Sequence, residues 1–292
     1  MAMKLVLRVF AVPFTAFVRS LVAALLFGVL AAKARSNAAN SGSDYNRLTA
    51  KDIAWIFVGG VSLGISNTAW NVSLTRTTVG ATSVLQLSSS VLLALYGILF
   101  LAERCTLLRK IALFLSVCGM FLVSWNGQDL SALASSQYFQ GNMFGLGAGV
   151  TWAITGVALK LTIKNRPGAV IVAPMFVLSA LTMVVPALLG EPLVAPLNAA
   201  AIALLLLTGV LGLGVGNFLF AQSMRTIPAS IGAAALTICP LLSMTCGTLF
   251  LHEPITAYLL LGGPLTSLGV AIAFLSMSNG ARAASAGSLP AE

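Results

Sequence analysis

The sequence predicts an all-α polytopic membrane protein whose helices form two inverted repeats. Three observations lead to this fold class: the composition, a series of apolar segments of membrane-spanning length, and an internal repeat. Of the 292 residues, 58% are hydrophobic and 8% are charged, and the mean hydropathy is +0.98. Because charged residues make up about 25% of an average soluble domain, this composition excludes a soluble globular protein.

Transmembrane helices need about 20 mostly apolar residues, and a series of segments in this chain meets that requirement. In chain order, the nine segments are residues 9–31, 53–74, 79–102, 107–125, 142–163, 169–189, 199–221, 229–251 and 257–277. Polar stretches at residues 33–51 and 128–140 follow the first and the fourth segments, and the other connections are short. The tail at residues 280–292 is small and polar, so we expect it to be disordered.

The net charge of +9 indicates membrane topology rather than nucleic-acid binding, because the basic residues stand singly or in small groups between apolar segments. Cytoplasmic loops hold the excess of Lys and Arg in membrane proteins. On one side of the predicted segments lie only Lys4, Arg8 and Arg76, and the other side holds the remaining loop and tail cations, Arg109 among them. We therefore expect a cytoplasmic C-terminus and an N-terminus outside.

The internal repeat is visible in one phrase, "LFLAERCT" at residues 99–106, which returns as "LFLHEPIT" at residues 249–256. The same shift of 150 positions, without a gap, pairs identical residues along both halves, including Gly59 with Gly209, Asn67 with Asn217, Glu103 with Glu253 and Gly119 with Gly269. By the charge count, Glu103 and Glu253 end their helices on opposite sides of the membrane. Inverted repeats of this kind are typical of secondary transporters, whose substrate sites lie near the midplane.

The chain resembles the EamA-type permeases of the drug/metabolite transporter (DMT) superfamily, and the resemblance covers almost its whole length. It is carried by these fragments in this order: "VPFTAFVRSLVAALL" (12–26), "SNTAWNVSLTRTTVGATSVL" (66–85), "LFLAERCT", "TWA" (151–153), "GNFLFAQSMRTIPAS" (216–230), "CPLLSM" (239–244) and "LFLHEPIT". The resemblance implies ten helices in two inverted five-helix repeats around a central cavity, with both termini in the cytoplasm.

This chain departs from that pattern at its start, because the shift places the partner of segment 142–163 mostly before residue 1. We expect a first repeat at residues 1–126 with four helices, lacking the family's first helix, and a second repeat with five helices at residues 139–279. Three explanations would account for the missing first helix: a truncated chain, a misassigned start codon, or a family member with nine helices. Competence to transport depends on which of them holds, because the family's first helix lines the cavity.

Enzymatic chemistry is not expected. The seven acidic residues all lie in loops or at predicted helix ends, and the one histidine is His252, so no paired carboxylates or nucleophile with a base occur inside an apolar segment. The four cysteines form no Cys-x-x-Cys pair, and we expect no metal site, disulfide framework or cofactor. Proton-driven carriers commonly use a carboxylate or histidine inside the membrane. Because the apolar segments contain no such residue, the sequence predicts facilitated diffusion or exchange rather than proton symport.

Three charged residues admit both a structural and a functional interpretation. Glu103 and Glu253 each directly precede another helix, where a carboxylate caps the free amide groups, and we favour this structural role over cation binding. Arg19 lies well inside an apolar segment. It either attracts a substrate carboxylate or snorkels outward to anchor its helix.

The substrate-cavity candidates are polar, aromatic or helix-breaking residues on helical faces away from the ends. Trp152, near the middle of its segment, is our first choice. Pro240 would free a backbone carbonyl in the middle of a helix, whereas for the amide residues interhelical packing is an equal alternative. The full set is Trp152, Asn67, Trp70, Asn71, Gln86, Ser89, Ser90, Asn217, Cys239, Pro240 and Arg19.

Together these observations predict a permease of the inner membrane. The resemblance implies efflux of a metabolite of the amino-acid type, with the lipid bilayer and a small-molecule substrate as partners and no nucleic acid. Hydroxyl, amide and indole groups with almost no fixed charge suit a neutral or zwitterionic solute. The alternatives are a non-transporting membrane protein, either a fragment or an assembly partner, and an exchanger of phosphorylated sugars or nucleotide sugars.

Overall fold

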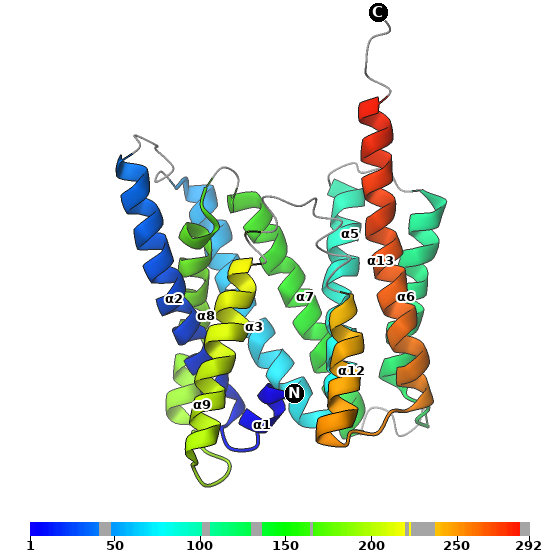
Figure 1. The fold of residues 1–292 in the computed structure, drawn as a ribbon, viewed down its shortest axis with the longest axis horizontal. Helices are drawn as coiled ribbons and strands as arrows, with labels where there is room; N and C mark the ends of the chain where they lie inside the picture. Colours follow the sequence, from blue (N-terminus) through cyan, green and yellow to red (C-terminus); the bar gives the residue numbers. More distant parts are fainter. Residues whose placement is uncertain are drawn as a thin grey trace, which may run out of the picture. The chain divides into compact units, whose positions relative to one another are not determined.

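The computed structural model describes residues 1–40, 48–100, 106–129, 136–163, 166–219, 222 and 237–286. Most of these residues are helical (Figure 1). The elements are α1 (Ala2–Val6), α2 (Val12–Asn40), α3 (Ala50–Arg76), α4 (Val79–Gln86), α5 (Ser88–Phe100), α6 (Leu107–Trp125), α7 (Gln137–Ile163), α8 (Gly168–Leu189), α9 (Ala199–Leu207), the π-helix η2 (Thr208–Val215), α12 (Ile238–Leu251) and α13 (Ala257–Ala286). The predicted all-α class is confirmed for this part of the chain.

Eight spans among the described residues are long and apolar enough to cross a membrane, and α12 is a shorter apolar helix. The differences from the predicted segments are local. The first span begins at Val12 rather than residue 9, the third is interrupted at Leu87 between α4 and α5, and the seventh contains η2. Residues 223–236, which include the start of the predicted eighth segment, lie outside the described residues. The expected disordered tail overlaps the end of α13 at Ala286, and residues 287–292 are likewise not described.

Residues 9–11 do not join the first helix because they make an antiparallel bridge to the connection after α8. Phe10 pairs with Leu193, the Ala11 amide donates to the Pro192 carbonyl at 3.0 Å, and the Val194 amide donates to the Val9 carbonyl at 2.8 Å. These hydrogen bonds tie the turn before α2 to the connection after α8, and α2 starts only after them. The connection before α2 is therefore tied to the connection between α8 and α9.

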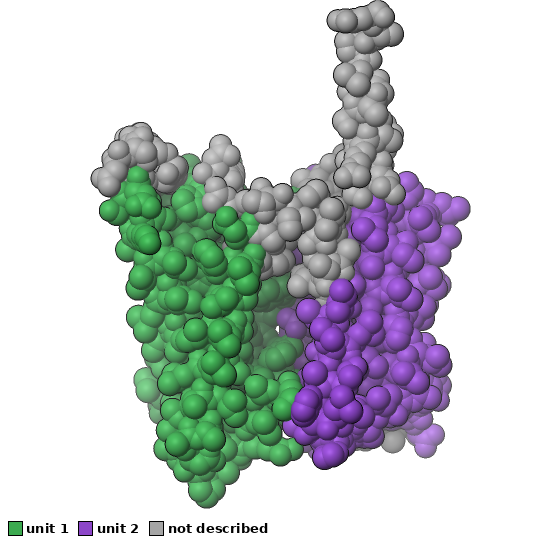
Figure 2. Space-filling model, viewed as in Figure 1, with its two compact units in different colours: residues 1–75, 150–222 green, residues 76–149, 223–292 purple. Residues whose placement is uncertain are grey.

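The chain divides into two compact units, and each draws on both halves of the sequence (Figure 2). Unit 1 contains residues 1–75 and 150–222, and unit 2 contains residues 76–149 and 223–292. The units are thus a different division from the predicted sequence repeats at residues 1–126 and 139–279. Helix α7 contributes its first part to unit 2 and its second part to unit 1.

Unit 1 is centred on the pair α2 and α8, which lie side by side (Figure 1). Phe27 stacks on Phe176 with ring centroids 5.5 Å apart, and the Ser20 and Ser179 hydroxyls are hydrogen-bonded at 3.0 Å. Helix α3 approaches closely through its glycines: a Cβ at Gly60 would meet the Met175 carbonyl oxygen at 2.9 Å. Apolar side chains of α2, α3, α7, α8 and η2 form the core of this unit.

Unit 2 is centred on α6 and α13, which occupy equivalent places in the two sequence halves. Gly119 of α6 packs against Gly262 and Thr266, and Gly269 of α13 packs against Ser116, so small residues face each other along the contact. Such residues let membrane helices approach closely and pack well. The surrounding core comes from α4, α5, α6, α12 and α13.

Candidate functional site

The predicted candidates divide between the two units, and each set is considered within its own unit. Unit 1 holds Arg19, Asn67, Trp70, Asn71, Trp152 and Asn217. Unit 2 holds Gln86, Ser89, Ser90, Cys239 and Pro240.

The most informative candidates lie on one face of α3. Asn67 and Asn71 are one helical turn apart, and their exposed fractions are 9% and 0%. Four of the buried polar atoms on this face have no hydrogen-bond partner among the described residues: Asn67 Nδ2, Trp70 Nε1, Asn71 Nδ2 and Asn71 Oδ1. Burying an amide without a partner costs about 1–3 kcal/mol, so native proteins rarely keep such groups without a reason.

These unpartnered atoms help to decide whether the amide residues serve interhelical packing or are available to a substrate. A polar residue that holds helices together must make hydrogen bonds to a neighbouring helix. Asn142 of α7 does so, because its Nδ2 donates to the Val123 carbonyl at 3.2 Å and its Oδ1 accepts from the Thr77 hydroxyl at 2.8 Å. Asn71 makes no such bond within the described part of the chain, which favours a group available to a ligand or to water.

Trp152 lies in the second part of α7 and is half-buried. Its ring packs against the apolar core of unit 1. On the same face of α7, one turn further, the Thr155 hydroxyl donates to the Gly59 carbonyl of α3 at 3.1 Å. The indole therefore occupies the α7 side of unit 1, with part of its surface exposed.

Gln86, Ser89 and Ser90 surround the interruption between α4 and α5 in unit 2. The Ser89 hydroxyl donates to the Gln86 carbonyl at 2.8 Å, and the Ser90 amide donates to the Leu87 carbonyl at 2.9 Å. Gly149 of α7 packs directly against this interruption, where a Cβ would meet the Gln86 carbonyl oxygen at 3.1 Å. The glycine here serves close packing.

Three candidates have local roles or differ from the expectation. The Asn217 side chain donates to the Leu213 carbonyl at 2.8 Å, four residues earlier in its own helix. Cys239 is exposed. Pro240 is a correction: it lies in the first turn of α12, which begins at Ile238, rather than in the middle of a helix. In a first turn the missing amide of proline leaves no helix hydrogen bond unmade.

Glu253 is a second correction. The sequence predicted that it caps the helix that follows, but the Thr256 hydroxyl caps α13 by accepting from the Leu259 amide at 3.2 Å. The left-handed backbone of His252, with φ of 53°, turns the chain at the end of α12. Glu253 Oε2 then accepts from the Val79 amide in the first turn of α4 at 2.8 Å. Glu253 therefore caps the N-terminus of α4 rather than that of α13. Glu103, its equivalent in the first half of the sequence, lies outside the described residues.

Arg19 of α2 is buried, with 6% of its surface exposed, and its Nη2 donates to the Thr208 carbonyl at 3.4 Å. A side chain that snorkels keeps its charged head in water. Snorkelling, one of the two alternatives for Arg19, is therefore excluded, because the guanidinium lies inside unit 1 beside η2.

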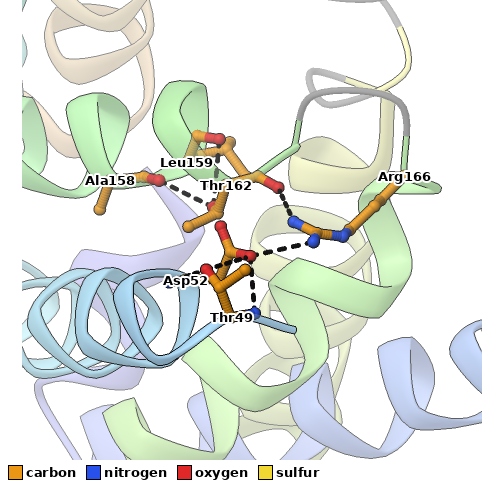
Figure 3. A network of polar contacts seen from close by, with 6 residues as sticks. All are labelled: Thr49, Asp52, Ala158, Leu159, Thr162 and Arg166. Carbon is orange, nitrogen blue, oxygen red and sulfur yellow. Dashed lines mark hydrogen bonds and ion pairs between the residues drawn. The ribbon is translucent and has the colours of Figure 1, made fainter. Parts of the chain in front are cut away.

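One polar network of unit 1 was not predicted (Figure 3). Asp52, at the start of α3, accepts from the Thr49 amide at 3.0 Å and from Arg166 Nη2 at 2.9 Å. The Asp52 amide donates in turn to the Thr49 hydroxyl at 3.2 Å. This reciprocal arrangement is a capping box, and its signature "TAKD" at residues 49–52 could have been found in the sequence. The partner Arg166 could not, because it lies 114 positions away.

A pocket of about 590 Å³ lies beside this network and is lined by Thr49, Ala50, Lys51, Asp52, Trp55 and Leu161. None of the predicted cavity residues lines it. Within the described ranges, no group of three or more His, Cys, Asp or Glu side chains is placed to hold a metal ion.

A second buried cation was also missed. Arg109, which the charge count placed among the cytoplasmic residues, has 1% of its surface exposed in the first turn of α6, and its Nη2 donates to the Ala94 carbonyl at 3.2 Å. No spacing in the sequence distinguishes it from the exposed Lys110 beside it.

The chain matches the model of the EamA-like transporter family over residues 1–125 and 139–275. Two proteins of Bacillus subtilis (strain 168) are similar over about two thirds of this chain. The uncharacterized transporter YvbV is 26% identical over 194 residues, covering 65% of this chain, and the uncharacterized transporter YoaV is 28% identical over 193 residues, also covering 65%. The aligned regions span 61% of YvbV and 65% of YoaV.

The fold is similar to that of a protein of known crystal structure, with a TM-score of 0.58 and 18% sequence identity. The match covers 92% of this chain and 96% of that protein. At 18% sequence identity, the match shows a similarity of fold and nothing about function. The family and the names of the two relatives point to a transporter rather than an enzyme.

Proposed function

This chain belongs to the EamA-like transporter family, a group of multi-pass membrane proteins, and from that premise we propose that it exports a small neutral or zwitterionic metabolite, such as an amino acid. Export proceeds across the inner membrane by alternating access, with the C-terminus in the cytoplasm. The substrate contacts the polar and aromatic candidates of unit 1, among which Asn67, Trp70, Asn71 and Trp152 come first.

The observation that carries this proposal is the set of unpartnered polar atoms on α3. The Asn71 side chain is fully buried and both of its polar atoms lack a partner among the described residues. An amide group offers donors and an acceptor without charge. Such groups, together with the indole of Trp70, recognise uncharged polar groups or zwitterions better than polyanions. An exchanger of phosphorylated sugars would need several basic side chains in the same place.

The test is the extracellular metabolite profile of cells that express the unmodified chain, Trp152→Ala or Asn71→Leu at matched membrane levels, beside an empty-vector control. We expect a solute that accumulates outside with the unmodified chain and less with either variant. The matched control is Thr75→Val on α3, because the Thr75 hydroxyl is exposed and bonded to the Val72 carbonyl of its own helix. This variant should export like the unmodified chain.

Two outcomes contradict the proposal. A profile equal to the empty vector for every chain favours the non-transporting alternative. Export that both variants leave unchanged removes Trp152 and Asn71 from the substrate path, although the chain would still be a transporter.

A further inference from the structure

Arg19 differs from Arg166, the other arginine of unit 1 with a described long-range contact, in how its charge is compensated. Arg166 forms an ion pair with Asp52 at 2.9 Å. Arg19 forms no ion pair with any described residue, and its Nε has no hydrogen-bond partner there. Its hydrogen bond to the Thr208 carbonyl is long at 3.4 Å. A buried guanidinium without a counter-charge is expensive inside a membrane, and such residues mark substrate or ion pathways.

The surroundings of Arg19 are built to admit the guanidinium. Thr208 is the first residue of η2, near the middle of the span Ala199–Leu219. Glycines line the side of η2 that faces Arg19: a Cβ at Gly212 would lie 3.3 Å from Arg19 Nη2, and one at Gly209 would lie 3.5 Å from Arg19 Cα. π-helical segments are rare and occur frequently at functional sites.

A second unpartnered group lies on the same face of α2. Thr15 precedes Arg19 by four residues, is completely buried, and its Oγ1 has no partner among the described residues. Arg19 is the eighth residue of α2 and therefore lies about 10 Å along the helix axis from Val12. Both side chains are thus buried inside the protein, and burial leaves their polar atoms little water to compensate them.

We propose that the exported solute carries a carboxylate and that Arg19 binds it, with the Thr15 hydroxyl as an additional donor. This inference rests on the proposed function and narrows its substrate class from neutral or zwitterionic solutes to those with a carboxylate. The guanidinium presents several N–H donors in a planar fork that matches a carboxylate, and its Nε has no hydrogen-bond partner among the described residues. Bound carboxylate supplies the counter-charge that the described residues do not.

The test uses the full chain, purified in detergent, and its thermal unfolding midpoint with three kinds of probe. The first kind consists of individual L-amino acids and short monocarboxylates, and the second of the corresponding amides. The third is inorganic phosphate, which tests whether the site binds the phosphate group of a lipid headgroup instead. We expect at least one carboxylate to raise the midpoint, and its amide and phosphate to leave it unchanged. For Arg19→Met the affinity for that carboxylate should fall roughly tenfold to a hundredfold, because a charged hydrogen-bonded pair is lost. Arg19→Lys should retain weakened binding.

Two further variants separate binding from a structural role. Gly212→Ala keeps the charge and places a methyl group against the guanidinium, so it should weaken carboxylate binding, whereas Gly28→Ala on α2, where a Cβ would meet nothing within 4 Å, should not. Without any probe, Arg19→Met should unfold at the same or a higher temperature than the unmodified chain, because an uncompensated buried charge is removed. Arg166→Met should unfold at a lower temperature.

The inference is overturned if no carboxylate raises the midpoint, if an amide or phosphate raises it equally, or if Arg19→Met binds like the unmodified chain. A lowered midpoint for Arg19→Met without probes, with carboxylate binding retained, assigns Arg19 a structural role instead. Failure of the proposed function is a different result: carboxylates bind through Arg19, but the cells export nothing. Export of a solute that lacks a carboxylate leaves the proposed function intact and overturns this inference.

Discussion

Thr266 of α13 and Ser116 of α6 lie 150 positions apart, and the Thr266 hydroxyl donates to the Ser116 carbonyl at 3.4 Å. The same shift that aligns the two halves of the sequence thus joins two residues in space. The glycine contacts around them are reciprocal, because Gly119 packs on Thr266 while Gly269, its equivalent, packs on Ser116. The two sequence halves meet here in an approximately two-fold arrangement inside unit 2.

This contact leads to a prediction about glycine. A Cβ at Gly119 would lie 2.6 Å from the Gly262 carbonyl oxygen, and one at Gly269 would lie 2.5 Å from the Ala112 carbonyl oxygen. Gly119→Val and Gly269→Val should each destabilise the protein by roughly 1–3 kcal/mol through overpacking. The measurement is unfolding of the purified chain in detergent. Gly147→Ala, at a position with open space, is the control and should be neutral or slightly stabilising.

Asn71 and Asn142, the fully buried asparagines among the described residues, should differ in how loss of the amide changes the stability of the protein. Asn142→Leu removes hydrogen bonds to Val123 and Thr77 and should lower stability by about 1–3 kcal/mol. Asn71→Leu removes an amide without partners and should leave stability unchanged or raise it, while reducing export. Thermal unfolding and export are measured on the same preparations. If Asn71→Leu is the more destabilised variant, Asn71 is a structural residue.

The ion pair between Asp52 and Arg166 should behave as one unit. Asp52→Asn leaves the half-buried Arg166 without its counter-charge, and Arg166→Met does the same to the buried Asp52, so each should lower the unfolding midpoint. The double variant should unfold well above the temperature expected from adding the two losses. Lys51→Met, which changes an exposed neighbour, is the control and should be close to neutral. Strictly additive losses would show that the two residues stabilise unit 1 independently.

A proton gradient should not drive transport. The four acidic side chains that the structure describes, Asp52, Asp129, Glu191 and Glu253, lie at helix ends or in connections rather than inside a span. Proton-coupled carriers commonly place such a group inside the membrane. In proteoliposomes, an imposed pH gradient should therefore give no uphill movement of the exported solute, whereas an opposing gradient of the same solute should accelerate exchange. Uphill movement driven by the pH gradient would contradict this prediction.

The sequence could propose candidate residues for the site because helical periodicity places residues on a face of a helix. Asn67 and Asn71 were both predicted as cavity candidates, and because they are four residues apart in α3 they lie on one face of that helix. Whether such a residue makes hydrogen bonds to a neighbouring helix or remains available to a ligand depends on which side chains and carbonyl groups the neighbouring helices place beside it. Asn71 and Asn142 are both buried asparagines within apolar segments, and only the packing distinguishes them.

Hydropathy and periodicity were enough to predict the all-α class, the membrane-spanning segments and the repeat at 150 positions, because these patterns lie within single segments and do not depend on how the helices are arranged. The tertiary structure alone decided which amide Glu253 caps, that Arg19 is buried beside η2, and that Asp52 pairs with Arg166. Each of these contacts joins residues more than 100 positions apart. Electrostatic and hydrogen-bond energies depend on distance in space, which no pattern along the chain specifies.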